Sequence, residues 1–254
     1  MNKIVDTHAH ICDPLFDEDR EQVLGRAQAA GVTAVIAVGE DLADARRNLA
    51  LSQKHPLLRP TAGLYPTHLD RGQADQMRAF IRRERRRLVA VGEVGLDFWV
   101  VQEDSEKELQ KEIFESFIAL GKELDLPLNV HSRAAGRHAV ALLLACGATR
   151  VQLHAFDGKA SAAQPAVEAG YFFSIPTSVV RSRQKQKLVK HLPLSSLLVE
   201  TDSPVLGPTP QARNEPANIV LAIKAIAELK NVPEEDVIEA LAENTRRLYG
   251  DLNG

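Results

Sequence analysis

The sequence predicts an α/β protein, a (β/α)₈ barrel of the TIM type that forms a single domain over residues 1–254. Three observations predict this fold. Short apolar runs alternate with helical patterns along the whole chain, without a break in composition. The chain has 254 residues, close to the ~250 residues usual for such a barrel. No glycine-rich phosphate loop follows the first predicted strand, which argues against the competing fold, a doubly wound open sheet.

Eight apolar runs are the predicted strands. They cover residues 4–7, 32–38, 58–64, 88–92, 128–130, 151–153, 171–174 and 197–200. Most are apolar on both faces, as expected for strands that lie between a filled barrel interior and covering helices.

Amphipathic patterns between these runs predict the helices. Leu109, Ile113 and Phe117 recur four residues apart, which predicts a long helix that ends before Pro127. Gly31 follows another helical pattern, at the position where a left-handed residue is favoured. Two further helices are expected near residues 217–229 and 233–248. The pattern therefore predicts helices between the strands along the whole chain.

Composition and charge limit the classes of function. The formal net charge is −3, so an anionic partner would need a local basic patch or bound cations. The apolar start of the chain is interrupted by Asp6, and no run approaches the ~20 residues of a membrane span. Cys12 and Cys146 form neither a CxxC pair nor a disulfide framework. We expect a cytoplasmic protein without a membrane partner, and nothing in the sequence implies an oligomer.

Ionisable residues at the ends of five predicted strands are the strongest functional signal. They are His8 and His10, Glu93, His131, His154 and Asp202. Strand ends meet at the C-terminal mouth of a barrel, where active sites lie. Imidazoles and carboxylates are ligands of Zn²⁺, Mn²⁺ and Fe²⁺. Each residue alone has a simpler explanation, such as a helix cap or a hydrogen-bonded loop histidine; the joint pattern favours a metal site.

An ordered set of motifs across the chain resembles the TatD family of metal-dependent deoxyribonucleases. The motifs are DTHAH at residues 6–10, GEVGLD at 92–97, NVHSR at 129–133, HAFDG at 154–158, ETDSP at 200–204 and RNEP at 213–216. Residues 171–192 look similar to the branch called TatD-domain-containing protein three. The HxH pair alone marks the wider amidohydrolase superfamily.

The resemblance implies a TIM-type barrel with two divalent metal ions that hydrolyses phosphodiester bonds in DNA. Carried over by position, His8, His10 and Asp202 hold one ion, His131 and His154 hold the second, and Glu93 bridges them. Glu93 and Asp202 are the expected catalytic residues, and Asp202 is either a general base or only a ligand. The metal remains open among Zn²⁺, Mg²⁺ and Mn²⁺. We expect 3′-5′ exonuclease action on single-stranded DNA.

Three further residues are expected to bind substrate. Arg133 follows a ligand and could grip a phosphate, or pair with a carboxylate at the rim. Many family members have Gly-x-His-Pro-His after the third strand, whereas this chain has GLYPTH at residues 63–68. Tyr65 could hydrogen-bond a phosphate or nucleoside or simply pack at the rim, and His68 could approach the leaving group. This departure leaves the substrate more open than the metal site.

Other candidates carry weaker expectations. Arg181, Arg183, Lys185, Lys187 and Lys190 could follow a nucleic-acid backbone or form a solvated helix face. Residues 82–87, rich in arginine, are expected at the surface away from the site. Phe98 and Trp99 could stack on a base or cover the mouth. Asp97 is expected to orient a ligand. Arg213, Asn214 and Glu215 are expected to fix a loop, with Asn214 or Glu215 able to line the pocket.

Two other functions compete with the nuclease. One is a hydrolase of a small amide, lactone or cyclic imide, which would act on small molecules and ignore oligonucleotides. The cationic residues Arg133 and Arg181 to Lys190 argue for an anionic substrate instead. The other is a non-catalytic binding or scaffold protein, against which the six intact ligand types argue.

Overall fold

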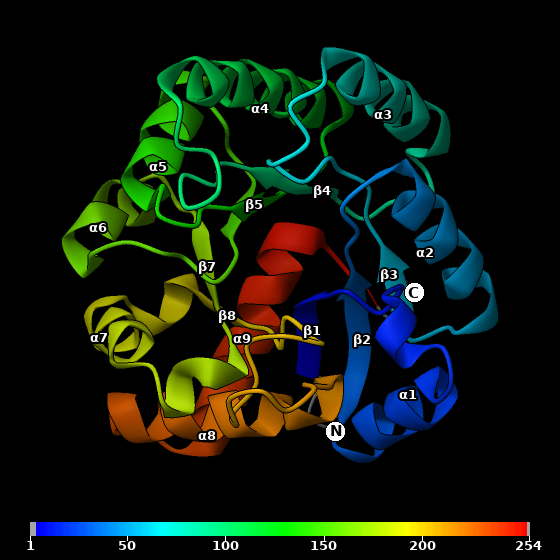
Figure 1. Cartoon of the computed structure of the whole chain (residues 1–254). Coiled ribbons are helices and arrows are strands. Elements are labelled where there is room, and N and C mark those ends of the chain that lie inside the picture. The colour runs from blue at the N-terminus through cyan, green and yellow to red at the C-terminus, as the bar shows by residue number, and fades with distance from the viewer. Residues whose placement is uncertain (1–3, 253–254) are drawn as a thin grey trace.

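The strands of the computed structural model, which describes residues 4–252, form a parallel barrel with helices around it (Figure 1). The eight strands of this described part are β1 (Ile4–Ala9), β2 (Val32–Ala37), β3 (Leu58–Pro60), β4 (Val91–Gly95), β5 (Leu128–His131), β6 (Val151–Leu153), β7 (Phe172–Ile175) and β8 (Leu197–Val199). Every strand pairs in parallel with its neighbour in sequence, except between β3 and β4.

Two junctions close the barrel where the regular ladder is interrupted. Between β3 and β4, a single parallel bridge joins Ala62 to Val91, and Gly92 N–H donates to the Ala62 carbonyl over 2.8 Å. Between β8 and β1, Asp202 N–H donates to the His8 carbonyl over 2.9 Å. Short segments beyond the strand ends therefore complete the ring, and one of them carries a predicted ligand.

The helices surround the strands, and the last one covers the barrel floor. They are α1 (Arg20–Ala29), α2 (Leu42–Lys54), α3 (Arg71–Glu84), α4 (Asp104–Leu124), α5 (Gly136–Ala145), α6 (Ala160–Glu168), α7 (Arg183–His191), α8 (Ile219–Lys230) and α9 (Glu234–Tyr249). In Figure 1, α1 to α8 lie outside the ring, whereas α9 crosses behind its centre. Helix α9 packs against β1 and β8. The chain end therefore approaches the barrel interior from the side opposite the mouth.

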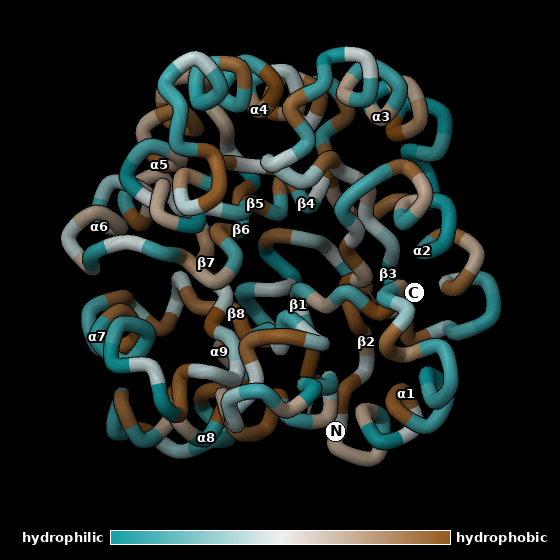
Figure 2. Tube along the Cα trace, in the orientation of Figure 1, coloured by the Kyte–Doolittle hydropathy of each residue, from teal (hydrophilic) through white to brown (hydrophobic). Residues whose placement is uncertain are grey.

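Apolar side chains form two separate clusters. The larger cluster lies between strands and helices and includes Phe117, Leu153 and Ile226. The smaller one includes Ile36 with Leu248 and further side chains from strands and the chain end. In Figure 2, the hydrophilic residues of the outer helices lie mainly on their outward sides. Burial of one helix face against the strands thus stabilises the barrel, as the periodicity predicts.

The predicted fold class is confirmed, with corrections to individual elements. The third strand ends at Pro60, not at residue 64. The fourth is Val91–Gly95 in place of residues 88–92, so Glu93 lies within β4 and does not follow it. The first extends to Ala9 and includes His8. The predicted domain also contains residues 1–3 and 253–254, which lie outside the described residues.

Glycines explain the displacement of β4. A Cβ atom on Gly92 would lie 2.6 Å from the Asn129 Cβ atom, and one on Gly95, at φ +145°, would collide with the His131 carbonyl. Glycine weakens a strand prediction, yet here it allows β4 to approach β5 closely. Within residues 4–252, no helix combines the length and apolar character needed to cross a membrane.

Candidate metal centre and active site

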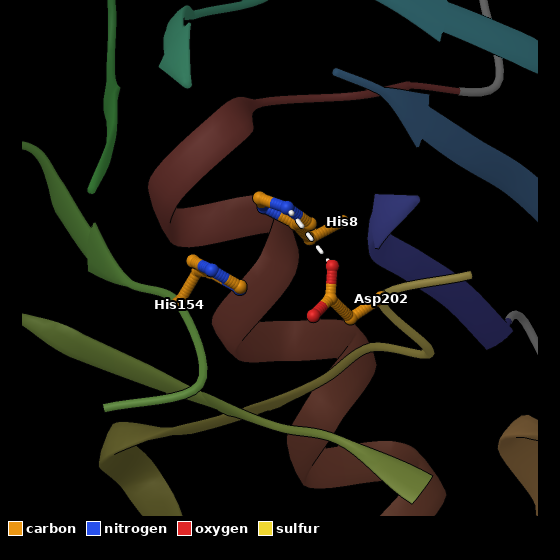
Figure 3. Close-up of side chains that lie close together, drawn as sticks. All are labelled: His8, His154 and Asp202. Atoms are coloured by element: carbon orange, nitrogen blue, oxygen red, sulfur yellow. Dashed lines mark ion pairs between the residues drawn. The ribbon is translucent and has the colours of Figure 1, made fainter. Parts of the chain in front are cut away.

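The six predicted ligands come together at the mouth of the barrel. His8 and Glu93 lie in β1 and β4, His131 ends β5, and His10 and His154 directly follow β1 and β6. Asp202 follows β8 after a short segment. Their ligand atoms form three overlapping groups, each within 4.8 Å: His8, His154 and Asp202; His8, His10 and Glu93; and Glu93, His131 and His154. Figure 3 shows the side chains of the first group pointing toward one another.

The Glu93 carboxylate lies at the centre of this cluster. Its Oε1 atom lies 2.8 Å from His131 Nδ1 and 3.2 Å from His154 Nε2. Its Oε2 atom lies 3.6 Å from His8 Nε2 and 3.3 Å from His10 Nε2. The two oxygens thus face different histidine pairs. Oε2 is buried and has no hydrogen-bond partner among the described residues.

Asp202 supplies the second carboxylate that faces His8 and His10. Its Oδ1 atom lies 3.5 Å from His8 Nε2 and 3.6 Å from His10 Nε2. The backbone of Asp202 has φ +55°, a left-handed conformation that aspartate adopts more readily than most residues. The Asp202 side chain is 8% exposed against 1% for Glu93. Of these two carboxylates, Asp202 is therefore the one nearer to solvent.

Mutual electrostatics shift the pKa values of the cluster in opposite directions. Burial and the neighbouring His154 hold the pKa of His8 well below its usual range. Burial acts to lower the pKa of His10, but its contacts with Glu93 prevail and raise the value to about 9. Burial acts to raise the pKa of Glu93, yet the surrounding histidines hold it well below its usual range. Burial raises the pKa of Asp202 to about 6. The centre therefore combines an ionised Glu93 with histidines in different protonation states.

His8 is oriented by Asn129, a residue of the NVHSR motif that received no role from the sequence. Asn129 Oδ1 lies 2.8 Å from His8 Nδ1. Asn129 Nδ2 donates to the Thr7 carbonyl over 3.1 Å, which fixes the amide with its oxygen toward the histidine. His8 Nδ1 therefore carries the proton and donates, and Nε2 is unprotonated and faces His10 over 3.3 Å.

Glu200 lies behind His154 in the same way and was also missed. Its Oε1 atom accepts from Ala155 N–H over 2.8 Å and lies 3.3 Å from His154 Nδ1. Its Oε2 atom accepts from Ser174 Oγ over 2.5 Å. Glu200 is fully buried, so these contacts replace its hydration. Its place two residues before Asp202 is the one sequence signal that could have drawn attention to it.

Asp97 contacts His131, as expected for a residue that orients a ligand. Asp97 Oδ2 lies 3.1 Å from His131 Nε2, and Oδ1 accepts from the N–H groups of Trp99 and Val100, both over 3.0 Å. The Tyr65 hydroxyl lies 3.4 Å from Asp97 Oδ2 and 3.5 Å from His131 Nε2. Tyr65 is half-buried at the rim, and its hydroxyl faces Asp97 and His131.

The other two predicted substrate-binding residues lie further out. Arg133 is exposed, and its guanidinium lies over the Trp99 ring, 5.2 Å from the centroid. Trp99 is itself 63% exposed. His68 is partly buried in the loop after β3, where its N–H donates to the Tyr65 carbonyl over 2.9 Å. Arg133 and Trp99 thus form a cationic and aromatic surface beside the mouth.

The basic group after β7 does not act as one surface, which corrects the expectation for Lys185. Lys185 is buried, and its Nζ donates to the carbonyls of Ala155 (2.6 Å) and Phe156 (2.8 Å). It therefore fixes the loop that begins with His154. Arg181, Arg183, Lys187 and Lys190 are exposed. The arginines of residues 82–87 are exposed too, and Arg82 pairs with Glu123.

The RNEP segment makes the hydrogen bonds expected of a loop-fixing element. Asn214 is fully buried, and its Nδ2 atom donates to Thr201 O (2.7 Å) and Val205 O (2.9 Å). Glu215 pairs with Arg26, and Arg213 pairs with Asp19. This segment therefore fastens the loop that holds Asp202.

The cluster fits a divalent cation. A buried, ionised carboxylate oxygen without a hydrogen-bond partner faces two imidazole nitrogens, and a buried charge of this kind is stable only with a counter-charge. Imidazole and carboxylate are the ligand types of intermediate divalent metals. Three of the histidine rings have a polar partner on the nitrogen that does not face Glu93. The partners are Asn129 for His8, Asp97 for His131 and Glu200 for His154. This arrangement is usual for metal-binding histidines.

Comparison with known proteins identifies the family. The family model described as TatD related DNase matches residues 5–250. The chain is 43% identical to the human protein named deoxyribonuclease TATDN3, over 98% of this chain and 95% of that one. It is 33% identical to YabD of Bacillus subtilis, named an uncharacterized metal-dependent hydrolase, over 97% and 98% of the two chains.

A solved structure agrees with these matches. The crystal structure of YjjV, a TatD homolog from Escherichia coli K12, superposes with a TM-score of 0.91 at 29% identity, covering 98% of this chain and 99% of that one. Fold, motif order and clustered ligands all point the same way. The chain belongs to the TatD-related DNase family of metal-dependent hydrolases.

Proposed function

We propose that this chain is a DNase that removes nucleotides from the 3′ end of single-stranded DNA, with two divalent cations at the barrel mouth. Its family and the name of its human relative support a DNA substrate. The observation that carries the two-ion arrangement is the Glu93 carboxylate, whose two oxygens face separate histidine pairs. Zn²⁺, Mg²⁺ and Mn²⁺ are all compatible with such a donor set. The cytoplasmic location stays a prediction from sequence.

Each proposed ion has its own ligands. His8, His10 and Asp202 would hold one ion, His131 and His154 the other, and Glu93 would bridge them. The overlapping group of His8, His154 and Asp202 means that the donors form one continuous cluster, so the division rests on the orientation of Glu93. Divalent cations supply Lewis acidity here: they lower the pKa of bound water and neutralise charge on a phosphate.

The remaining roles belong to side chains of the chain itself. Asp202 and Glu93 are the proposed catalytic residues, and the greater exposure of Asp202 suits it to exchange a proton with water at the mouth. Arg133 offers a planar cationic group to a phosphate. Tyr65 is proposed to contact the terminal nucleotide because its hydroxyl lies beside His131, and His68 because it lies on the same loop after β3.

A labelled oligonucleotide assay tests this function. Purified protein is chelated, given Mg²⁺, Mn²⁺ or Zn²⁺, and incubated with single-stranded DNA whose label survives shortening from the 3′ end. A double-stranded oligonucleotide and the Asp202→Ala variant are the controls. Stepwise 3′ shortening that requires metal, prefers the single strand and is lost in Asp202→Ala is expected. Bound metal without cleavage of either DNA would reject the nuclease and favour the hydrolase of a small amide, lactone or cyclic imide.

A further inference from the structure

A chain of buried hydrogen bonds crosses the barrel floor beneath the candidate metal centre. It begins at Tyr249, the last residue of α9, whose side chain enters the barrel from the end opposite the mouth. In Figure 3, α9 passes behind the clustered side chains. The hydroxyl of Tyr249 contacts two buried amides, Gln152 on β6 and Asn129 on β5.

The first arm leads from Tyr249 to His154. The Tyr249 hydroxyl donates to Gln152 Oε1 over 2.6 Å, and Gln152 Nε2 donates to Ser174 Oγ over 2.8 Å. Ser174 Oγ donates to Glu200 Oε2 over 2.5 Å. The other oxygen of Glu200 lies 3.3 Å from His154 Nδ1. Burial of the four linking side chains excludes bulk water from this arm.

The second arm leads from Tyr249 to His8. Asn129 Nδ2 donates to the Tyr249 hydroxyl over 3.4 Å, a long contact, and Asn129 Oδ1 lies 2.8 Å from His8 Nδ1. The two arms therefore end on the Nδ1 atoms of two histidines whose rings stack, with centroids 3.7 Å apart.

The Thr7 carbonyl fixes the orientation of both amides in this chain. It accepts from Asn129 Nδ2 over 3.1 Å and from Gln152 Nε2 over 3.2 Å. A carbonyl oxygen can only accept, so both amide nitrogens must face Thr7. The Gln152 oxygen then faces Tyr249 and requires a donor. Burial raises the pKa of the Tyr249 hydroxyl above its usual range, which keeps that donor protonated.

We propose that Tyr249 is a positioning residue for the metal centre: by joining the two arms it holds His8 with Nδ1 toward Asn129 and His154 with Nδ1 toward Glu200, so that both Nε2 atoms are directed to the metal. This inference rests on the proposed function, in which both histidines are ligands. Removing the hydroxyl leaves the buried Gln152 oxygen without its donor. Gln152 cannot rotate to compensate, because its oxygen would then face the Thr7 carbonyl, so the displacement is passed to Ser174 and Glu200.

The test compares two buried tyrosine hydroxyls, one at the barrel floor and one away from it. Tyr249→Phe removes the hydroxyl at the floor. Tyr171→Phe removes another buried hydroxyl, which donates to the Ala148 carbonyl over 2.8 Å outside the barrel interior. Zn²⁺ affinity is measured by competition with a chromophoric chelator, and thermal unfolding of the metal-free proteins is followed in parallel. Outer partners of metal ligands typically change affinity 10–100-fold, and we expect about 10-fold weaker binding for Tyr249→Phe and less than about 2-fold for Tyr171→Phe.

A second variant keeps the test valid if Tyr249→Phe does not fold. Ser174→Ala breaks the same arm without touching α9, and we expect a loss similar to that of Tyr249→Phe, about 10-fold. If both variants fold, the double variant should lose no more Zn²⁺ affinity than the single variant that binds more weakly, because the two changes interrupt one pathway. Additive losses of affinity would show that Tyr249 and Ser174 do not act through one arm.

The outcomes separate this inference from the proposed function. If the unaltered protein binds Zn²⁺ and His8→Ala weakens that binding, but Tyr249→Phe and Ser174→Ala bind as the unaltered protein does, the positioning role is rejected and the metal centre stands. If equal losses occur in Tyr249→Phe and Tyr171→Phe, the effect is general destabilisation and the role is rejected. If the unaltered protein binds no metal, the proposed centre fails first and the role of Tyr249 fails with it.

Discussion

The rings of His8 and His154 stack face to face, with centroids 3.7 Å apart and planes inclined by 9°. One ring comes from β1 and the other directly follows β6, so the contact spans the barrel interior. Two stacked imidazoles repel when both carry a proton, and the pKa of His8 is accordingly lowered by burial and by His154. Glu200 and Glu93 act against burial to raise the pKa of His154. The pair therefore divides into a neutral and a protonated ring, both with Nε2 toward the carboxylates.

Replacing Glu93 by glutamine should weaken binding at both metal positions. Each carboxylate oxygen faces its own histidine pair, and an amide offers one weak oxygen ligand and no charge. We expect both ions to lose at least about 100-fold in affinity, the upper end for outer partners of ligands. Equilibrium dialysis followed by elemental analysis measures metal per chain.

His10→Ala is the matched comparison for that experiment. His10 Nε2 contacts Glu93 Oε2 and Asp202 Oδ1 but belongs to none of the donor groups that contain His131. One metal per chain should remain in His10→Ala. Retention of two ions in Glu93→Gln would contradict the bridging assignment.

Metal binding should release protons near neutral pH. Burial acts to lower the pKa of His10, but Glu93 raises it to about 9, so the metal-free side chain is protonated at pH 7.5. A metal must displace that proton, and affinity should therefore rise as pH increases toward 9 and fall as it decreases. Calorimetric titration in buffers of different ionisation enthalpy should give at least about one proton released per chain. Equal heats in all buffers would show that neither His10 nor His154 gives up a proton to the metal.

The barrel and the clustering of the candidate ligands could be predicted because both depend on local pattern. Apolar runs specify strands, and residues that end consecutive parallel strands must meet at one rim. Thus His8, His131 and Asp202 are recognisable without any contact information. The strand that carries Glu93 was predicted too early, since it begins at Val91. Gly92 and Gly95 weaken the strand pattern there, and the close approach of β4 to β5 requires both glycines.

The residues that orient the ligands could not be predicted in this way. Asn129, Gln152 and Tyr249 meet only because α9 returns to the barrel floor, and no pattern in the sequence encodes that distance. The prediction for Lys185 was wrong for another reason. Its basic neighbours suggested a surface, although Lys185 shares a helix face with the buried Leu188 and Val189, a spacing that indicates the inner side.

The paired Trp99 and Arg133 side chains should contribute to substrate binding. Trp99 is 63% exposed, with the Arg133 guanidinium 5.2 Å from its ring centroid. Stacking of a base on an aromatic ring contributes about 1–3 kcal/mol, so Trp99→Ala should raise KM for single-stranded DNA about 5- to 160-fold while kcat changes little. Val100→Ala, a change at the neighbouring exposed residue (55%), is the control. A fall in kcat without a change in KM would place Trp99 in the chemistry and not in binding.

Asn214→Asp should destabilise the protein by changing one buried atom. Asn214 Nδ2 contacts three oxygens, Thr177 Oγ1 (3.0 Å), Thr201 O (2.7 Å) and Val205 O (2.9 Å). A carboxylate oxygen at that position would face these acceptors with no N–H of its own, and we expect the free energy of unfolding to fall by about 3 kcal/mol or more. Asn231→Asp makes the same chemical change at an exposed helix end with φ +55°, where aspartate is tolerated, and should cost less than about 1 kcal/mol. Urea unfolding of the metal-free proteins measures both. Asn214 holds the Thr201 carbonyl next to Asp202, so metal binding should be weaker in Asn214→Asp alone. Equal metal affinity in the two variants would show that the position of Asp202 does not depend on this hydrogen bond.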